Sequence, residues 1–161
     1  PRPALPAAPP GDPGSPAEPD LPGTGLPVGM LSLLDIDTTQ GHAQSGRFLI
    51  GDEAAVRGLP VAAEAMKLLY ALAFDHLGLR RVHGHIAAGN PLMIKWQKYL
   101  GMQEEGRLRQ HVFIDGSFQD LVLLGLMEHE YRKTALPRLN ALIAAARPRR
   151  AAAPVSDTVS A

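Results

Sequence analysis

The sequence predicts an α/β or α+β fold, in which helices flank a mixed sheet. Three observations support this prediction. Short β-like runs and helical stripes follow one another in the order β-β-α-β-α-β-β. Residues 61–77 place apolar side chains at helical spacing and are followed by Gly78, at the usual position of a helix stop. Asp115 and Gly116 separate two β runs, which is a strong hairpin signal.

The other elements follow from local signals in chain order. Gln40 and Gly41 indicate a turn between the first two strands. Asn90 as N-cap and Pro91 at the first helical position predict the start of the second helix, which Gly101 ends. With these boundaries, strands are expected over 28–37, 45–53, 80–88 and on both sides of the hairpin turn, and a last helix over 136–146.

The two ends of the chain differ in composition from its centre. Residues 1–27 hold ten of the fifteen prolines and few large apolar side chains, so they cannot bury enough surface to offset their ordering entropy. We expect 1–27 to be disordered and 147–161 to form a second disordered tail. The domain is then expected over 28–131, with a further helix within 132–146.

Composition excludes several kinds of site. The 16 Lys and Arg residues balance 16 Asp and Glu residues, so no basic field indicates nucleic acid. The absence of cysteine excludes disulfides, thiolate zinc sites and a cysteine nucleophile. No apolar run approaches the roughly 20 residues of a membrane span, and no signal peptide pattern is present. We therefore expect a cytoplasmic protein that binds neither nucleic acid nor membrane.

Two patterns suggest a site, and each has a simpler interpretation. The loop over 57–62 contains Gly58 and leads into a helix, whose exposed N–H groups would attract an anion. On these residues alone, an ordinary strand-to-helix connection is the preferred interpretation, because strand-loop-helix units are common. His83 and His85 alternate on one strand and share a face. A His-x-His pair can bind metal, but no third ligand has a suitable spacing. A structural role or a polar position lining a cleft is therefore preferred, and no metal is expected.

Four stretches of sequence carry a more specific signal than any single motif. They are VGMLSLLDID, FLIGDE, RGLPVAAEAMKLLYALAFDHLGLRRVHGHI and NPLMIKWQKYLGMQEEGRLRQHVFIDGSFQDLVLLGL. Together they resemble the second half of the GNAT superfamily, the acetyl-CoA-dependent N-acetyltransferases. The segment LGMQEEGRLRQHVFIDGSFQD is similar to the branch that holds ribosomal-protein-alanine acetyltransferases and the amino-sugar acetyltransferases of pseudaminic acid synthesis.

The resemblance implies a site for acetyl-CoA. Its pyrophosphate is expected at the loop before the first helix, and its pantetheine arm in a gap where two parallel strands splay apart. Asn90 is expected to contact that arm. Pro60 stands where the family prefers glycine and has no N–H to donate. The residues implied to bind the cofactor are Phe48, Leu49 and Ile50 on the strand, Arg57, Gly58, Leu59, Val61 and Ala62 in the loop, and Asn90.

The resemblance also implies direct attack of a primary amine on the thioester. Many members use a tyrosine seven residues after the asparagine as acid, and here that position is Gln97, which cannot supply a proton. His85 is the expected polar group in the cleft. The expected acceptor is a nucleotide-linked amino sugar. The alternatives are a protein N-terminus, or a non-catalytic remnant that acts as a binding module.

A GNAT domain normally begins with a strand, two helices and another strand. Here the proline-rich residues 1–27 stand in their place, so the expected fold lacks the usual N-terminal strand and two helices. A truncated gene, a fragment of a longer chain and a half-domain completed by a partner all fit this pattern. Because such a fold exposes a sheet edge and apolar helix faces, it would favour pairing into a homodimer.

Overall fold

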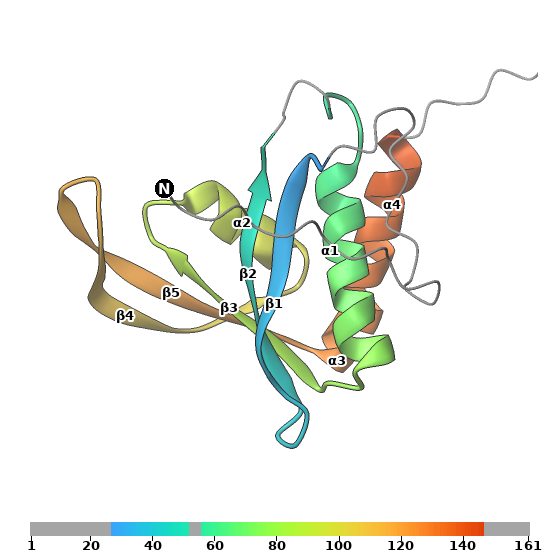
Figure 1. Cartoon of the computed structure of the whole chain (residues 1–161), viewed down its shortest axis with the longest axis horizontal. Coiled ribbons are helices and arrows are strands. Elements are labelled where there is room, and N and C mark those ends of the chain that lie inside the picture. The colour runs from blue at the N-terminus through green and yellow to red at the C-terminus, as the bar shows by residue number, and fades with distance from the viewer. Residues whose placement is uncertain (1–26, 52–55, 147–161) are drawn as a thin grey trace, which may run out of the picture.

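The computed structural model of the chain describes residues 27–51 and 56–146. Figure 1 shows a sheet and helices that pack on it. The strands are β1 (Gly29–Asp37), β2 (His42–Ile50), β3 (Arg81–Ala87), β4 (Gln103–Ile114) and β5 (Ser117–Met127). The helices are α1 (Val61–Ala71), α2 (Pro91–Tyr99), α3 (Glu128–Glu130) and α4 (Leu136–Ala146), with π-helical turns η1 (Leu72–His76) and η2 (Tyr131–Ala135).

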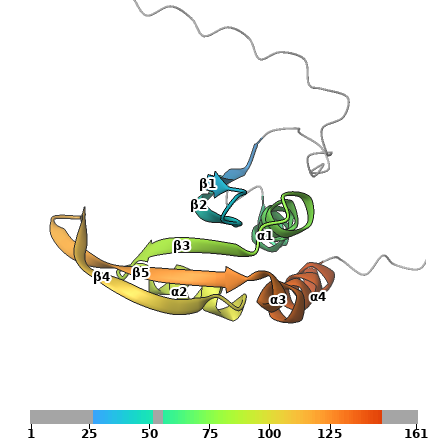
Figure 2. The same ribbon diagram turned by 90° about the horizontal axis from the view of Figure 1, so that it is seen from below.

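The five strands lie in the order β1-β2-β3-β5-β4. The β2–β3 pair is parallel and the other three pairs are antiparallel, so the sheet is mixed, as predicted. Helices α1 and α4 lie side by side at one end of the β3–β5–β4 part of the sheet (Figure 2), and α2 lies against that part. The predicted fold class is confirmed.

Local capping signals set the helix ends. Helix α1 begins at Val61 and runs through η1 to His76, after which Gly78 takes a positive φ of 64°. Helix α2 begins at Pro91, and the Asn90 Oδ1 atom accepts the Met93 backbone N–H at 3.1 Å. An uncapped helix start leaves backbone N–H groups without partners, so this bond stabilises α2 where the chain leaves β3.

The core lies between the helices and one face of the sheet. Val82 on β3 and Leu124 on β5 are completely or almost completely buried there. Aromatic side chains from separate elements meet above them: the rings of Phe74 and Tyr131 stack with centroids 4.9 Å apart, and Tyr70 lies 5.7 Å from Tyr131. This cluster joins α1 and η1 to η2, and it positions α1 beside the sheet.

The β4–β5 hairpin has the predicted two-residue turn at Asp115 and Gly116, both with positive φ. With a two-residue turn and an unbroken ladder, His111 would lie opposite Asp120, but this pair does not form. Near the turn the register is as expected, but β4 then places residues 109–111 opposite Asp120 alone before Leu108 pairs with Leu121. The extra β4 residues form a bulge, and the Asp120 Oδ1 atom accepts the Gln110 backbone N–H at 3.0 Å.

Three further expectations differ from the structure or lie outside it. The second strand begins at His42 rather than Ser45, so the half-buried His42 belongs to the strand. Its expected end at Glu53, and the disorder expected for 1–26 and 147–161, lie outside the described residues. Within residues 27–51 and 56–146, no helix has the length and apolarity needed to cross a membrane.

Candidate functional site

The two parallel strands of the sheet separate after a short ladder. Three residue pairs join β2 to β3, and the last of them is Gln44↔His83. Beyond this point β2 continues to Ile50 beside β1, and β3 continues to Ala87 beside β5. Backbone N–H and C=O groups on the inner edges of both strands therefore face the gap and can pair with an extended ligand.

A β-bulge in β2 accounts for this fork. Between the pairs Ser32↔Gly46 and Met30↔Leu49, β1 has one residue and β2 has two, Arg47 and Phe48. Arg47 takes a φ of 53°, in the left-handed region. A bulge bends its strand and increases the twist, so β2 turns away from β3 at this level. Where the ladder ends, the Ser45 hydroxyl donates to the His83 carbonyl at 3.3 Å.

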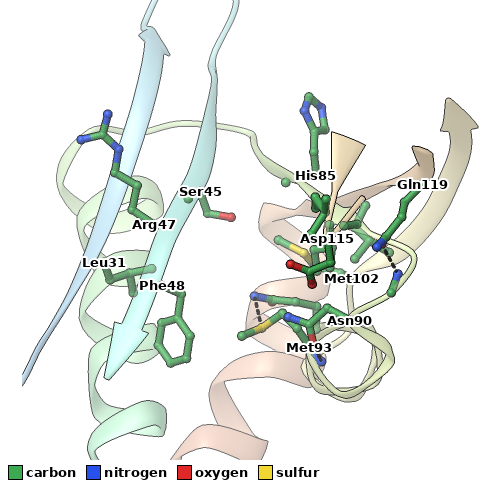
Figure 3. A pocket seen from close by; sticks show the side chains of 18 residues that line it. Leu31, Ser45, Arg47, Phe48, His85, Asn90, Met93, Met102, Asp115 and Gln119 are labelled. Carbon is green, nitrogen blue, oxygen red and sulfur yellow. Dashed lines mark hydrogen bonds between the residues drawn. The ribbon is translucent and has the colours of Figure 1, made fainter. Parts of the chain in front are cut away.

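The fork opens into a cavity of about 430 Å³. Figure 3 shows Leu31, Ser45 and Phe48 on the β2 side and His85, Asn90 and Met93 across the gap. The wall is mainly apolar and carries a few polar groups, as is usual for sites that bind small molecules. The remaining lining residues are Gly46, Arg47, Gly84, Ile86, Ala87, Gly89, Gln97, Met102, Ile114, Asp115, Gln119 and Leu124.

Asn90 contributes one amide atom to the fold and offers the other to the cavity. Its Oδ1 atom is used by the N-cap bond to Met93, so the Nδ2 group is the donor that it can present to a ligand. Beside it, the Gln119 Oε1 atom accepts the Gly89 backbone N–H at 3.0 Å, which ties the loop before α2 to β5. These bonds fix the cavity wall at the end of β3.

His85 is exposed and lines the cavity, and it belongs to a row of three imidazoles. The ring centroids of His85 and His83 are 5.7 Å apart, as are those of His83 and His42. Burial lowers the pKa of His83, and the neighbouring Arg81, His85 and His42 lower it further. This lowered pKa favours the neutral form of His83, and His85 is the imidazole that a ligand in the cavity can reach.

The loop expected to hold pyrophosphate lies outside the cavity lining. Arg57, Gly58 and Leu59 are exposed, Gly58 takes a φ of 78°, and an added Cβ there would meet no heavy atom within 4 Å. Among the described residues, no side chain caps the first turn of α1, and the start of a helix presents N–H groups that attract an anion. This helix start and the end of β2 lie at the same end of the molecule (Figure 1).

Of the sequence-predicted site residues, the structure brings Phe48, His85 and Asn90 together in one cavity. Leu49 is 59% exposed, and it and Ile50 lie further along β2, where they pair with β1. Val61 and Ala62 open α1. Sequence reasoning missed Ser45, Gly84, Met93 and Gln119. The available signal was a glycine within each of the two strand segments SGRF and HGH, because a strand glycine often marks a bend or a close approach of another group.

Metal-binding side chains do not cluster in the lining of the cavity. Among the described residues, no three His, Cys, Asp or Glu side chains form a group that could hold a metal ion. Acetyl-CoA, the ligand implied by the resemblance, fits the site on other grounds, because two open strand edges suit its amide-containing arm and a mainly apolar wall suits its chain.

Comparisons with known proteins point in the same direction. The family model described as "Acetyltransferase (GNAT) domain" matches residues 18–103. The chain is 32% identical to the putative ribosomal N-acetyltransferase YdaF of Bacillus subtilis, over 64% of this chain and 55% of that protein. It is 26% identical to the spermidine N(1)-acetyltransferase of Vibrio cholerae, over 65% of this chain and 58% of that protein. It thus spans little more than half the length of these relatives.

A solved structure gives the same answer for the fold. A putative acetyltransferase from T. thermophilus superposes with a TM-score of 0.60 at 27% identity, over 71% of this chain and 59% of that one. The family match covers more than half of the 161 residues. The predicted superfamily is therefore confirmed, and this chain belongs to the GNAT acetyltransferases.

Proposed function

We propose that this chain binds acetyl-CoA in the fork between β2 and β3 and transfers the acetyl group to a primary amine. The single observation that carries the proposal is the fork itself. The parallel ladder ends after Gln44↔His83, and a cavity of about 430 Å³ lies between the separated strands. GNAT acetyltransferases use acetyl-CoA, and the chain's relatives are N-acetyltransferases.

The proposed placement assigns a task to each element around the fork. The inner edge of β2 at Phe48 and the Asn90 amide would bind the pantetheine arm. The pyrophosphate would lie at Arg57, Gly58 and the open N–H groups that start α1. Pro60 offers no N–H to it, so the cationic Arg57 takes a larger share of the phosphate contacts.

Bound acetyl-CoA supplies the acetyl group as a thioester. Attack requires an uncharged amine, since an ammonium group has no lone pair. The new nitrogen–carbon bond forms, the carbon–sulfur bond breaks, and the amine loses one proton while the thiolate gains one. His85 is the imidazole at the cavity surface, and we assign to it the acceptance of the proton from the amine.

We propose that the acceptor is a primary amine, and a nucleotide-linked amino sugar is the preferred candidate. The segments VGMLSLLDID and EEGRLRQHVFIDG resemble the amino-sugar enzymes more closely than the ribosomal-protein enzymes. The named activities of the relatives support two other amines, a ribosomal protein and spermidine. Asp115 lines the cavity, and its anionic side chain suits the ammonium group that each of these acceptors carries before it loses a proton.

Two measurements test the proposal. Calorimetry with acetyl-CoA should show binding that is lost when the fork is filled by Gly84→Val, because a Cβ at Gly84 already lies 3.2 Å from the Ser45 Oγ atom. Gly106→Val is the matched control, since Gly106 is a strand glycine outside the cavity with 3.5 Å of room to the Leu123 side chain. No heat with millimolar acetyl-CoA and a folded sample would refute the proposal.

Turnover separates catalysis from binding alone. Release of free thiol should be followed with an amino-sugar nucleotide, an N-terminal peptide of a ribosomal protein and spermidine. A second candidate, binding without catalysis, is favoured by Gln97 at the position of the family's usual tyrosine and by Pro60. Calorimetric binding without thiol release for any of the three amines would select that candidate.

A further inference from the structure

Apart from tyrosines, Gln97 is the one residue with a polar side chain that is buried among those the structure describes, with 7% of its surface exposed. It lies on α2 and lines the cavity beside Met93 and Met102. A buried amide lowers stability unless its donors and acceptors are satisfied. Its place between the core and the cavity therefore calls for an explanation.

The side-chain oxygen of Gln97 accepts a hydrogen bond from a core residue. The fully buried Tyr70 hydroxyl donates to the Gln97 Oε1 atom at 3.3 Å, across the contact between α1 and α2. Burial raises the pKa of Tyr70 far above its ordinary value, so the phenol keeps its proton and acts as a donor. The hydrogen bond therefore fixes the direction of the amide.

Within residues 27–51 and 56–146, the Gln97 nitrogen has only a weak partner. The Gln97 Nε2 group lies 4.0 Å from the Met93 sulfur, the contact drawn as a dashed line in Figure 3. A thioether is a poor acceptor. The opposite amide orientation would set the Oε1 atom against that sulfur, one acceptor against another, so the observed orientation is favoured. Gln97 thus presents an N–H donor at the cavity wall, where a sulfur atom already lies within its reach.

We infer that the Gln97 amide donates a hydrogen bond to the sulfur of CoA as the acetyl group leaves, and that Tyr70 is the residue that positions it. The inference rests on the proposed function. The carbon–sulfur bond breaks and the sulfur keeps the electron pair, so negative charge develops on the sulfur, and an N–H donor in the cavity wall would stabilise it. Gln97 supplies no proton; the thiolate takes its proton from water after release.

The test compares binding of CoA with binding of a CoA analogue in which hydrogen replaces the thiol. Calorimetry at pH 9.5, where a thiol with an ordinary pKa of about 8.5 is mostly ionised, isolates the contribution of the sulfur. In the unmodified chain CoA should bind about tenfold more tightly than the analogue, as expected for a hydrogen bond to a charged group. At pH 7 this ratio should shrink.

The variants separate donor, positioning residue and fold. Gln97→Leu alone would leave the Tyr70 hydroxyl unsatisfied, so Tyr70→Phe/Gln97→Leu removes both polar partners and protects the core. We expect this double variant to reduce the ratio at pH 9.5 to about one, and Tyr70→Phe alone to give an intermediate ratio. Gln44→Leu, half-buried on β2 and outside the cavity lining, is the matched control and should leave the ratio unchanged.

The outcomes are distinct. If neither ligand binds the unmodified chain, the proposed function fails and this inference fails with it. If both ligands bind and the double variant keeps the original ratio, the inference fails while the proposed function stands. A ratio that rises in the double variant would show that Gln97 presents its oxygen to the sulfur, which also contradicts the inference.

Discussion

The two polar atoms of the Asn90 side chain serve different purposes, and substitution can separate them. Asn90→Ser keeps an N-cap oxygen for Met93 but lacks the amide nitrogen that faces the cavity. We predict that this variant keeps the stability of the parent chain within about 0.5 kcal/mol, while acetyl-CoA binds several-fold more weakly. Asn90→Ala should lose about 1 kcal/mol as well.

Urea unfolding and calorimetry measure these two effects independently. Equal acetyl-CoA affinity in Asn90→Ser and the parent chain would show that the amide nitrogen does not contact the ligand. Unchanged stability in Asn90→Ala would show that the Met93 bond does not cap α2 in solution. Both measurements are needed, because a loss of affinity in Asn90→Ala alone could reflect a frayed helix.

The same residue shows what can be predicted at this scale. Asn90, Pro91 and Gly78 were predictable because capping depends on a few neighbouring residues. The contact between Tyr70 and Gln97 was not predictable, because these residues lie 27 positions apart in sequence, on two different helices. The sequence showed only that Gln97 occupies an unusual position, and the fold shows what the side chain contacts there.

At the scale of elements, the β4–β5 hairpin depends on the carboxylate of Asp120. This group accepts the Gln110 N–H at the bulge, where Gln110 takes a φ of 49°. We predict that Asp120→Ala costs about 1 kcal/mol and speeds amide hydrogen exchange around residues 108–112. The Arg107 guanidinium lies 3.8 Å from Asp120, so Arg107→Ala is the control that removes the ion pair and keeps the bulge bond. Equal exchange rates in the two variants would contradict the prediction.

The hairpin also shows why strand register is harder to predict than strand existence. The turn at Asp115-Gly116 was evident from two residues. The shift near Gln110 depends on a side chain from the facing strand, and the bulge at Arg47 and Phe48 depends on β1. The order of elements was therefore predictable, whereas the fork that forms the cavity depends on the β2 bulge and on the length of the β2–β3 ladder.

At the scale of the whole molecule, the expected pairing of copies stays a prediction with a clear test. The rings of Phe113 and Phe118, 63% and 65% exposed, meet with centroids 5.0 Å apart on the hairpin that includes edge strand β4. We predict that Phe113→Ser/Phe118→Ser lowers self-association measured by sedimentation velocity, because it removes exposed apolar area. Leu68→Ser, 49% exposed on α1, is the control. Identical distributions for all three proteins would exclude this surface.

The row of imidazoles formed by His42, His83 and His85 should make the stability of the fold depend on pH. His83 is surrounded by His42 from β2, Arg81 and His85 from β3, and Glu105, which is paired with Arg81, from β4. Its pKa is lowered on folding, so the unfolded chain binds a proton more readily than the folded one. This contribution to stability is complete above an unfolded pKa of about 6.5 and is lost as the pH falls below it.

We predict that His83→Gln flattens the stability profile between about pH 6.5 and pH 5. Partial exposure limits the effect to about 0.5 kcal/mol.

Glu105 acts over a separate pH range, because its hydrogen bond with Arg81 lowers its pKa, and its contribution to stability is lost only as the pH falls below about 4.5. Urea unfolding at several pH values measures both, with His129→Gln, an exposed histidine on α3, as the control. If His83→Gln and His129→Gln give the same profile as the parent chain, protonation of His83 does not destabilise the fold. The destabilisation by acid would then have to come from the carboxylates.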